Sequence, residues 1–377
     1  MSKEPNPKAR RRITGRRLAI FSLIVIVVFF VALELLARVV FFQMERGGLA
    51  LPLAVRTAQL KVANRVQGPL QAGIKKKGKD IFQGFYGPDG EGIRAHLTGE
   101  YERWFLRLQK ACQQADSKLV VLYIPVPRWP ERGSPLSVSE KFCRGYFRDL
   151  SAKHRVEFWD AAELIHTNDA TVISLYPEDP HLNTTGNHLV AAYLRTRLAE
   201  VASIRSKTKY SPQPGALYGD FLPNQNRIEE GAIPIRRITN SHGCRGLRDL
   251  DAEKKRQRIL FLGDSFTYGT GVESFESFPA ILERQVKDVE FLNAGKYGYT
   301  IVDEATLFEE RARHCAPDIT VLQVLDNDLI GLLSYKLNSF SRERTKQPFQ
   351  PTEEELTFLK KFLNEEEIAY IKRGGAS

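Results

Sequence analysis

The chain has 377 residues, of which 42% are hydrophobic and 27% charged, so it can form one large or two ordinary domains with a substantial core. This composition excludes collagen-like, low-complexity and wholly disordered chains. The formal net charge is +10, but residues 1–17 contain seven basic residues and one acidic residue, which gives 7 − 1 = +6 and leaves 10 − 6 = +4 for the rest. We therefore expect no general nucleic-acid-binding surface and no nucleic-acid partner.

The segment from Leu18 to Phe42 is almost wholly apolar, with charges at Glu34 and Arg38. As a helix it would be about 37 Å long at about 1.5 Å per residue, which is enough to cross a bilayer. The basic cluster before it predicts a cytoplasmic tail at 1–17, a single-pass anchor at 18–42 in the inner membrane and a periplasmic remainder. A cleaved signal peptide is the alternative, which the length of the apolar run disfavours.

Four cysteines are too few for a disulfide-built scaffold, and their spacing fits no metal site. The predicted compartment permits disulfides, but we expect buried free thiols at Cys112, Cys143, Cys244 and Cys315. The chain also lacks a phosphate-binding loop, because its GTGVES segment has no lysine. We expect neither a metal nor a cofactor.

After a polar stalk at 43–80, segments of strand length that are apolar throughout recur along the chain, at 118–126, 156–160, 258–263, 289–295 and 319–325. Segments with helical spacing alternate with them, at 97–115, 184–203, 277–286, 302–313 and 351–372. Thr184 or Thr185 is a suitable N-cap for the second of these helices. Residues 205–256 have few apolar runs and are expected to be a long connection. This alternation predicts an α/β domain with a parallel sheet covered on both faces.

Chemistry in such folds collects at the carboxyl ends of the strands. There Gly263-Asp264-Ser265 follows one predicted strand, where glycine permits a sharp turn and a serine can project its hydroxyl. Alone, this triplet is equally an ordinary helix cap.

Two further strand ends carry groups that can bind a negative charge. NAGKYGYT contains Gly298, whose N–H can approach a ligand closely, and Asn327 follows the next strand with a side-chain amide that can serve as an oxyanion donor. Taken singly, these are a turn and a helix cap.

In this order the three segments resemble the first three blocks of the SGNH (GDSL-type) hydrolase superfamily, over residues 238–330. The resemblance implies a flavodoxin-like three-layer α/β/α fold. It also implies that Ser265 is the nucleophile and that the Ser265 N–H, Gly298 and Asn327 form an oxyanion hole. The superfamily has its aspartate and histidine after the asparagine, whereas the last histidine here, His314, precedes Asn327.

An upstream segment, EDPHLNTTGNH, holds Asp179 and His181 and resembles the closing Asp-x-His block of the same superfamily. The domain at 81–377 is then circularly permuted, with the second half of the fold at 81–204, the connection at 205–256 and the first half at 257–377. Asp-x-His before the serine, with a membrane anchor, is similar to the O-acetyltransferases of alginate and related exopolysaccharides. A loop with a helix cap, or two truncated domains in tandem, are the alternatives.

The resemblance implies a serine enzyme that cleaves or transfers acyl esters, in which His181 takes the Ser265 proton and Asp179 orients the imidazole. Its expected substrate is an acyl ester of a cell-envelope polysaccharide, with transfer slightly favoured over hydrolysis. A non-catalytic carbohydrate-binding or assembly protein is the alternative. Three tyrosines in the site-forming loops are candidates for stacking on sugar rings, with aromatic core packing as the alternative for each: Tyr268, Tyr297 and Tyr299.

Overall fold

The computed structural model describes residues 76–127, 135–175, 179–210, 215–229, 234–251, 253–337 and 351–372. The chain divides into a unit at 1–67 and a compact unit at 68–377, and only the second contains described residues. The predicted tail at 1–17, the predicted span at 18–42 and most of the predicted stalk therefore lie outside the described residues. Within the described part, no helix combines the length and the apolar character needed to cross a bilayer.

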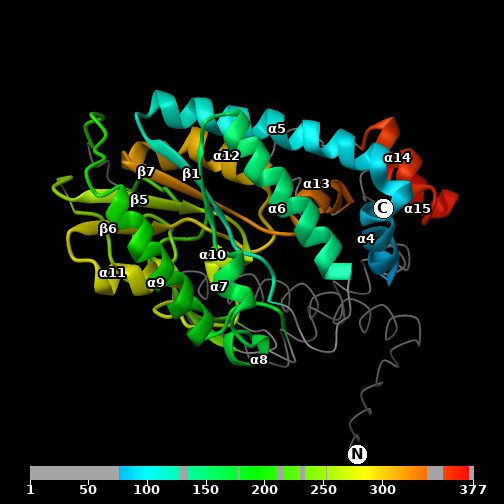
Figure 1. Ribbon diagram of the computed structural model, residues 1–377. Coiled ribbons are helices and arrows are strands. Elements are labelled where there is room, and N and C mark those ends of the chain that lie inside the picture. Colours follow the sequence, from blue (N-terminus) through cyan, green and yellow to red (C-terminus); the bar gives the residue numbers. More distant parts are fainter. Residues whose placement is uncertain are drawn as a thin grey trace, which may run out of the picture. The chain divides into compact units, whose positions relative to one another are not determined.

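The described residues contain a five-stranded parallel sheet with the strand order β2-β1-β7-β5-β6 (Figure 1). Its strands are β1 (Lys118–Tyr123), β2 (Glu157–Asp160), β5 (Gln257–Leu262), β6 (Val289–Asn293) and β7 (Ile319–Val324). Each segment predicted as a strand contributes one of them. The predicted α/β class with a parallel sheet is thereby confirmed.

Both faces of this sheet are apolar, which is why its strands are continuous hydrophobic runs. Successive side chains of a strand point to opposite faces. In β1, Val121 and Tyr123 join one hydrophobic cluster, whereas Val120 and Leu122 join a second cluster on the other face. Such a sheet needs helices on both sides.

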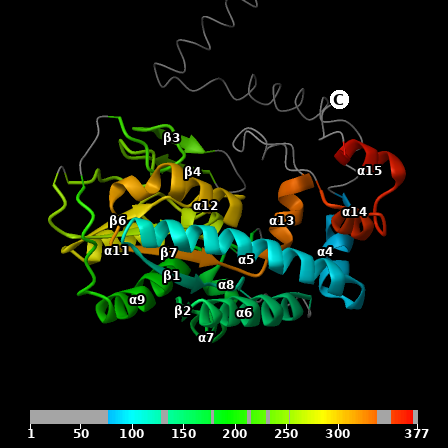
Figure 2. The same ribbon diagram turned by 90° about the horizontal axis from the view of Figure 1, so that it is seen from above.

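Helices cover both faces, as Figure 1 shows for α5 and α12 on one side and α9 and α11 on the other. The first layer packs through buried side chains of α5 (Glu91–Gln114), α6 (Pro135–Lys153), α12 (Ile301–Glu310) and α13 (Asp328–Leu337). The second layer consists of α7 (Ala162–His166), α8 (Ala170–Ile173), α9 (Thr184–Glu200) and α11 (Phe278–Gln285). At one end of the unit, α4 (Gly78–Tyr86), α14 (Glu353–Leu359) and α15 (Glu365–Lys372) extend the first layer (Figure 2).

The sequence predicts that residues 205–256 form only a long connection, but they also contain secondary structure. They include an antiparallel hairpin of β3 (Asn226–Glu229) and β4 (Ile235–Ile238). Each strand has four residues and β3 is mostly exposed, so neither produces an apolar run that sequence periodicity could detect.

The helix predictions also need correction. Helix α6 was not predicted, and α4 begins within the predicted stalk. The single helix predicted at 351–372 is two helices, because Asn364 and Glu367 form reciprocal backbone-to-side-chain hydrogen bonds of 2.8 and 2.9 Å that start α15. The cap of α9 is Asn183, whose Oδ1 accepts the Gly186 N–H at 3.1 Å, and neither of the predicted threonines serves.

Candidate active site

Ser265 begins the one-turn helix α10 (Ser265–Tyr268) directly beyond the carboxyl end of β5. The turn before it requires glycine, because Gly263 has φ +153° and a Cβ there would lie 2.4 Å from Thr267 Oγ1. Asp264 caps α10 by accepting the Phe266 N–H at 3.0 Å. The sharp turn thus brings the half-buried Ser265 to the edge of the sheet where parallel α/β folds place ligands.

His181 reaches Ser265 from the other half of the chain. Its Nε2 lies 2.8 Å from Ser265 Oγ, and its Nδ1 is hydrogen-bonded to Asp179 Oδ1. Asp179 Oδ1 also accepts the backbone N–H of His181 at 2.8 Å. The structure therefore brings together the three residues that the sequence singled out, in the order nucleophile, base and orienting carboxylate.

The loop that carries His181 is held by two asparagines that sequence reasoning did not single out. The side-chain amide of Asn183 donates to the carbonyls of Val172 and Ser174, each at 2.8 Å. The Asn187 amide donates to the carbonyls of Leu182 and Asn183 at 3.1 and 3.0 Å. Only the position of Asn183 before a helical pattern carried a local signal, that of an N-cap.

Two carboxyl groups at the site have opposite electrostatic environments. The hydrogen bond with His181 lowers the pKa of Asp179, which favours the ionised form that an orienting carboxylate needs. Burial raises the pKa of Asp264, next to the nucleophile, to about 6. Burial likewise raises the pKa of Glu304 and Asp328. Repulsion by Asp328 adds to the rise at Glu304, and repulsion by Asp264 adds to the rise at Asp328.

The two other residues predicted for the oxyanion hole come from the strands on either side of β5. Gly298 has φ +74° and is the third residue of a tight turn closed by the Tyr299 N–H and the Lys296 carbonyl at 3.1 Å, so this position favours glycine. Asn327 follows β7 and is exposed. Within the described residues, neither the Gly298 N–H nor the Asn327 side-chain amide donates to another group of the chain. Both donors are therefore available to a ligand, and neither is hydrogen-bonded to Ser265 itself.

Of the three tyrosines proposed to stack on sugars, only Tyr297 has an exposed ring, at 48%. Tyr268 is buried, with its hydroxyl hydrogen-bonded to Glu229, and the buried Tyr299 donates to Asp220 at 2.6 Å. Tyr268 and Tyr299 are therefore packed within the fold and do not present a ring on which a sugar could stack.

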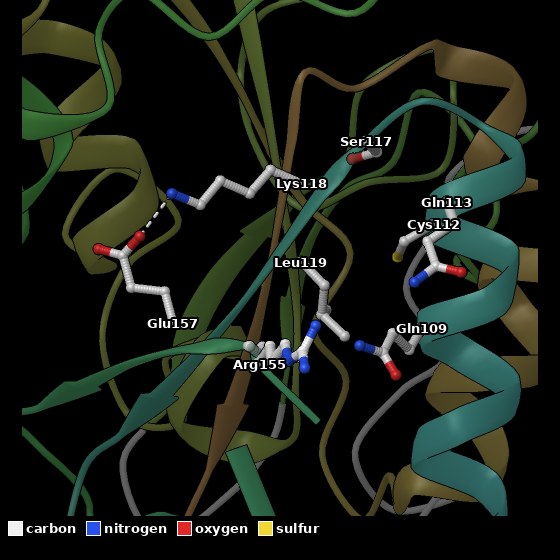
Figure 3. Close-up of a pocket in the computed structure, with 9 residues that line it drawn as sticks. Gln109, Cys112, Gln113, Ser117, Lys118, Leu119, Arg155 and Glu157 are labelled. Carbon is white, nitrogen blue, oxygen red and sulfur yellow. Dashed lines mark hydrogen bonds and ion pairs between the residues drawn. The ribbon is translucent and has the colours of Figure 1, made fainter. Parts of the chain in front are cut away.

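A cavity with a volume of about 470 Å³ lies elsewhere in the unit (Figure 3). It opens at the amino end of β1, whereas Ser265 follows the carboxyl end of β5. Because the strands are parallel, the cavity and Ser265 lie at opposite ends of the strands. Its lining includes none of the predicted site residues; it consists of Gln109, Cys112, Gln113, Ser117, Lys118, Leu119, Arg155, Val156 and Glu157.

The prediction of buried free thiols is confirmed for all four cysteines. In the described part of the chain, one group of side chains is arranged so that it could ligate a metal, namely His96, Glu100 and Glu355 on α5 and α14. His96 Nε2 lies 3.9 Å from a Glu100 oxygen and 3.5 Å from a Glu355 oxygen. This group contains none of the residues around Ser265.

No family model matches the chain, and no curated protein matches it. The solved structures that are similar to it include the following two. The O-acetyltransferase domain of Pseudomonas putida AlgJ has 14% identity and a TM-score of 0.42, over 74% of this chain and 91% of that domain. Pseudomonas aeruginosa AlgX has 15% identity and a TM-score of 0.36, over 60% of this chain and 56% of AlgX.

A likeness at these identities and TM-scores does not bear on activity. The chemistry must be argued from the arrangement of Asp179, His181 and Ser265.

Proposed function

We propose that the protein is a serine acyl-ester enzyme of SGNH type. One observation carries the proposal: His181 Nε2 lies 2.8 Å from Ser265 Oγ, with Asp179 hydrogen-bonded to the opposite ring nitrogen. His181 accepts the hydroxyl proton as Ser265 attacks an ester carbonyl, and it returns that proton to the departing alcohol. The acyl-serine is then resolved by water or by a second hydroxyl.

The proposal includes a circular permutation of a flavodoxin-like domain. The strand order β2-β1-β7-β5-β6 supports it. When the chain is read from β5 to β7 and then through β1 and β2, this order becomes 2-1-3-4-5, which is the flavodoxin-like arrangement. Site geometry does not depend on chain order, so Asp179 and His181 take the place of a histidine block after Asn327.

The negative charge on the carbonyl oxygen would be stabilised by the Ser265 and Gly298 N–H groups and by the Asn327 amide. The ends of β6 and β7 flank the end of β5, so donors from both sides can converge above Ser265. Each donor of this type contributes about 2.7–4 kcal/mol of transition-state stabilisation.

We further propose that the physiological substrate is an acylated cell-envelope polysaccharide and that the enzyme transfers acetyl groups. The Asp-x-His order before the serine, similar to that of exopolysaccharide O-acetyltransferases, supports this, and so does the exposed ring of Tyr297 in the loop that bears Gly298. An exposed aromatic ring gives a sugar an apolar face to pack against.

The test of the activity is covalent labelling of Ser265 by a serine-directed phosphonate, with Ser265→Ala as the control. A labelled wild type and an unlabelled variant are expected. If the wild type stays unlabelled while it binds acetylated oligosaccharides, the protein is a non-catalytic binding or assembly protein.

A second measurement separates transfer from hydrolysis. The enzyme is loaded with an activated acetyl ester, and free acetate is compared with acetylated glycan as the acceptor concentration rises. A transferase should release less acetate as acetylated glycan accumulates, since a bound hydroxyl outcompetes water. If acetate release stays constant with every envelope-type acceptor, the enzyme is an esterase and not a transferase.

We propose, finally, that residues 18–42 anchor the enzyme in the inner membrane with its catalytic domain in the periplasm. The +6 charge of residues 1–17 supports this orientation. A reporter that is active only in the periplasm should be active when fused after Ser377. Activity of a cytoplasmic reporter alone at that position would overturn the topology.

A further inference from the structure

Arg245 lies in the segment before β5, and its side chain is one of the largest that are fully buried among the described residues, at 2% exposure. Its backbone N–H donates to the Asn293 carbonyl at the end of β6, at 2.9 Å. The residue therefore lies inside the frame that supports the nucleophile, although no motif of the sequence assigned it a role.

The guanidinium of Arg245 binds the last residue of α10, the one-turn helix that begins with Ser265, and the chain just after it. Its four hydrogen bonds go to groups that follow one another closely in the chain: the carbonyls of Tyr268, Gly269 (at 2.6 Å) and Val272, and Ser274 Oγ (at 3.1 Å). The guanidinium carbon also lies 4.2 Å from the centroid of the Tyr268 ring. Among the described residues, these hydrogen-bond acceptors are all uncharged.

Helix α10 needs hydrogen bonds from other parts of the chain to be stable. A helix of four residues is not stable by itself, and the carbonyls of its last turn have no helical partners. Within the helix, Thr267 is bound by side chains from two strands. Gln323 Oε1 accepts the Thr267 N–H and hydroxyl at 3.2 and 2.9 Å, and the Asn293 amide donates to the Thr267 carbonyl at 2.8 Å. Arg245 binds the carbonyl of the last residue of the helix and the carbonyls just after it.

An arginine is a costly way to fill this volume, because burying its charge carries a desolvation penalty that an apolar side chain avoids. Burial lowers the pKa of Arg245, which expresses the same penalty. Its advantage is geometric, since a planar guanidinium presents several donors in a rigid fork, whereas a lysine presents its three from one point. Only the fork can hold carbonyls as far apart in the chain as Tyr268 and Val272 together.

We propose that Arg245 is a positioning residue for Ser265. By holding the last carbonyl of α10 and those just after it, Arg245 fixes the turn that carries the nucleophile, and thereby the 2.8 Å approach of Ser265 Oγ to His181 Nε2. This inference rests on the proposed function of Ser265. A displacement of a reacting group by about 1 Å costs on the order of 10²-fold in rate.

The experiment compares Arg245→Lys with a matched control, Arg258→Lys, in the full chain. Arg258 is also fully buried, but it lies near the amino end of β5 and pairs with Glu290 at 2.7 Å. For each variant, the phosphonate labelling rate and the kcat and KM for a short acyl ester are measured at a temperature below the unfolding transition. The thermal midpoint is measured separately.

We expect Arg245→Lys to reduce the labelling rate and kcat about 10- to 100-fold while KM changes less than about threefold. Arg258→Lys should lower the thermal midpoint but leave the labelling rate of the folded protein at the wild-type value. If Arg245→Lys does not fold, Ser274→Ala removes the acceptor of the Arg245 Nε–H and leaves the three carbonyl acceptors of the guanidinium in place. It also removes the acceptor of the Ile238 N–H and the hydroxyl that bonds the Arg236 carbonyl, and it should slow labelling about threefold.

The inference is overturned if Arg245→Lys, or Ser274→Ala in its place, is labelled at the wild-type rate per folded molecule. It is also overturned if Arg258→Lys slows labelling to the same extent. Replacing a buried arginine would then reduce the reactivity of Ser265 whatever the position of that arginine. Absence of labelling in the wild type would be a different result, since it overturns the proposed function of Ser265 and this inference together.

Discussion

Asn187 connects the helix that follows His181 to a helix in the other half of the chain, because its Oδ1 accepts the backbone N–H of Phe278 at 2.9 Å. Its amide meanwhile donates to two carbonyls of the loop that enters α9. One buried side chain, 1% exposed, thus joins α9 to α11 and binds backbone groups of both α11 and the loop before α9. This bond links the segment that carries His181 to a segment that lies 91 residues further along the chain.

Asn187→Ala is therefore expected to destabilise the fold by about 1–3 kcal/mol, because it leaves buried backbone groups without partners. His188→Ala, at an exposed position of the same helix, is the control and should change stability by less than about 0.5 kcal/mol. Denaturant unfolding of both variants measures the difference, and equal effects would contradict the assigned role of Asn187.

Ser265→Ala and His181→Ala should each reduce ester turnover at least about 10³-fold, and the double variant should be no worse than either alone. The reason is that the hydroxyl and the imidazole act as one unit across a 2.8 Å contact. Steady-state rates of the three variants provide the comparison. Losses that multiply in the double variant would mean that the two residues act independently.

Asp179→Asn should lower kcat by about 10²- to 10⁴-fold with the fold intact, because an amide does not hold the imidazole in the tautomer that accepts the serine proton. The pKa of Asp179 is lowered in the folded state. Its contribution to stability is therefore present above its unfolded pKa of about 3.9 and is lost as the pH falls through the lowered value. Thermal midpoints of wild type and variant should differ at pH 6 and converge in strong acid.

Asp264 should have the opposite effect on stability, because burial raises its pKa to about 6. The folded state binds this proton more tightly than the unfolded state. The contribution is therefore complete below a pH of about 3.9 and is lost as the pH rises through about 6. Asp264→Asn keeps an acceptor for the Phe266 N–H but does not titrate. Between pH 4 and pH 7.5 the wild type should lose on the order of 3 kcal/mol relative to the variant. Parallel unfolding curves across this range would contradict the prediction.

Gly263→Ala should destabilise the protein by about 1–3 kcal/mol and slow the labelling of Ser265, because the new Cβ would lie 2.4 Å from Thr267 Oγ1 at a positive φ. Gly145→Ala is the matched control, since Gly145 lies in α6 with no atom within 4 Å of an added Cβ. Alanine there should raise stability by about 0.5–1 kcal/mol. The two variants should thus shift the thermal midpoint in opposite directions.

The amino-acid sequence by itself determined the strands, because an apolar run of strand length is a local property that records burial on both faces of a sheet. It also determined the sharp turn at Gly263 and the closeness of Asp179 to His181, since both depend on residues within a few positions of one another. The resemblance of these motifs to a known superfamily identified the three residues that the structure brings together.

Tertiary structure alone decided which polar side chains hold this site in place. Nothing local distinguishes Arg245 from an exposed arginine, or Asn187 from any other polar residue of a helix. Their carbonyl and N–H partners, at Gly269 and Phe278, lie 24 and 91 residues away. The β3–β4 hairpin likewise leaves no apolar run in the sequence. A buried polar group is stable only where the packed chain supplies its hydrogen-bond partners, and that condition is set by contacts between distant segments.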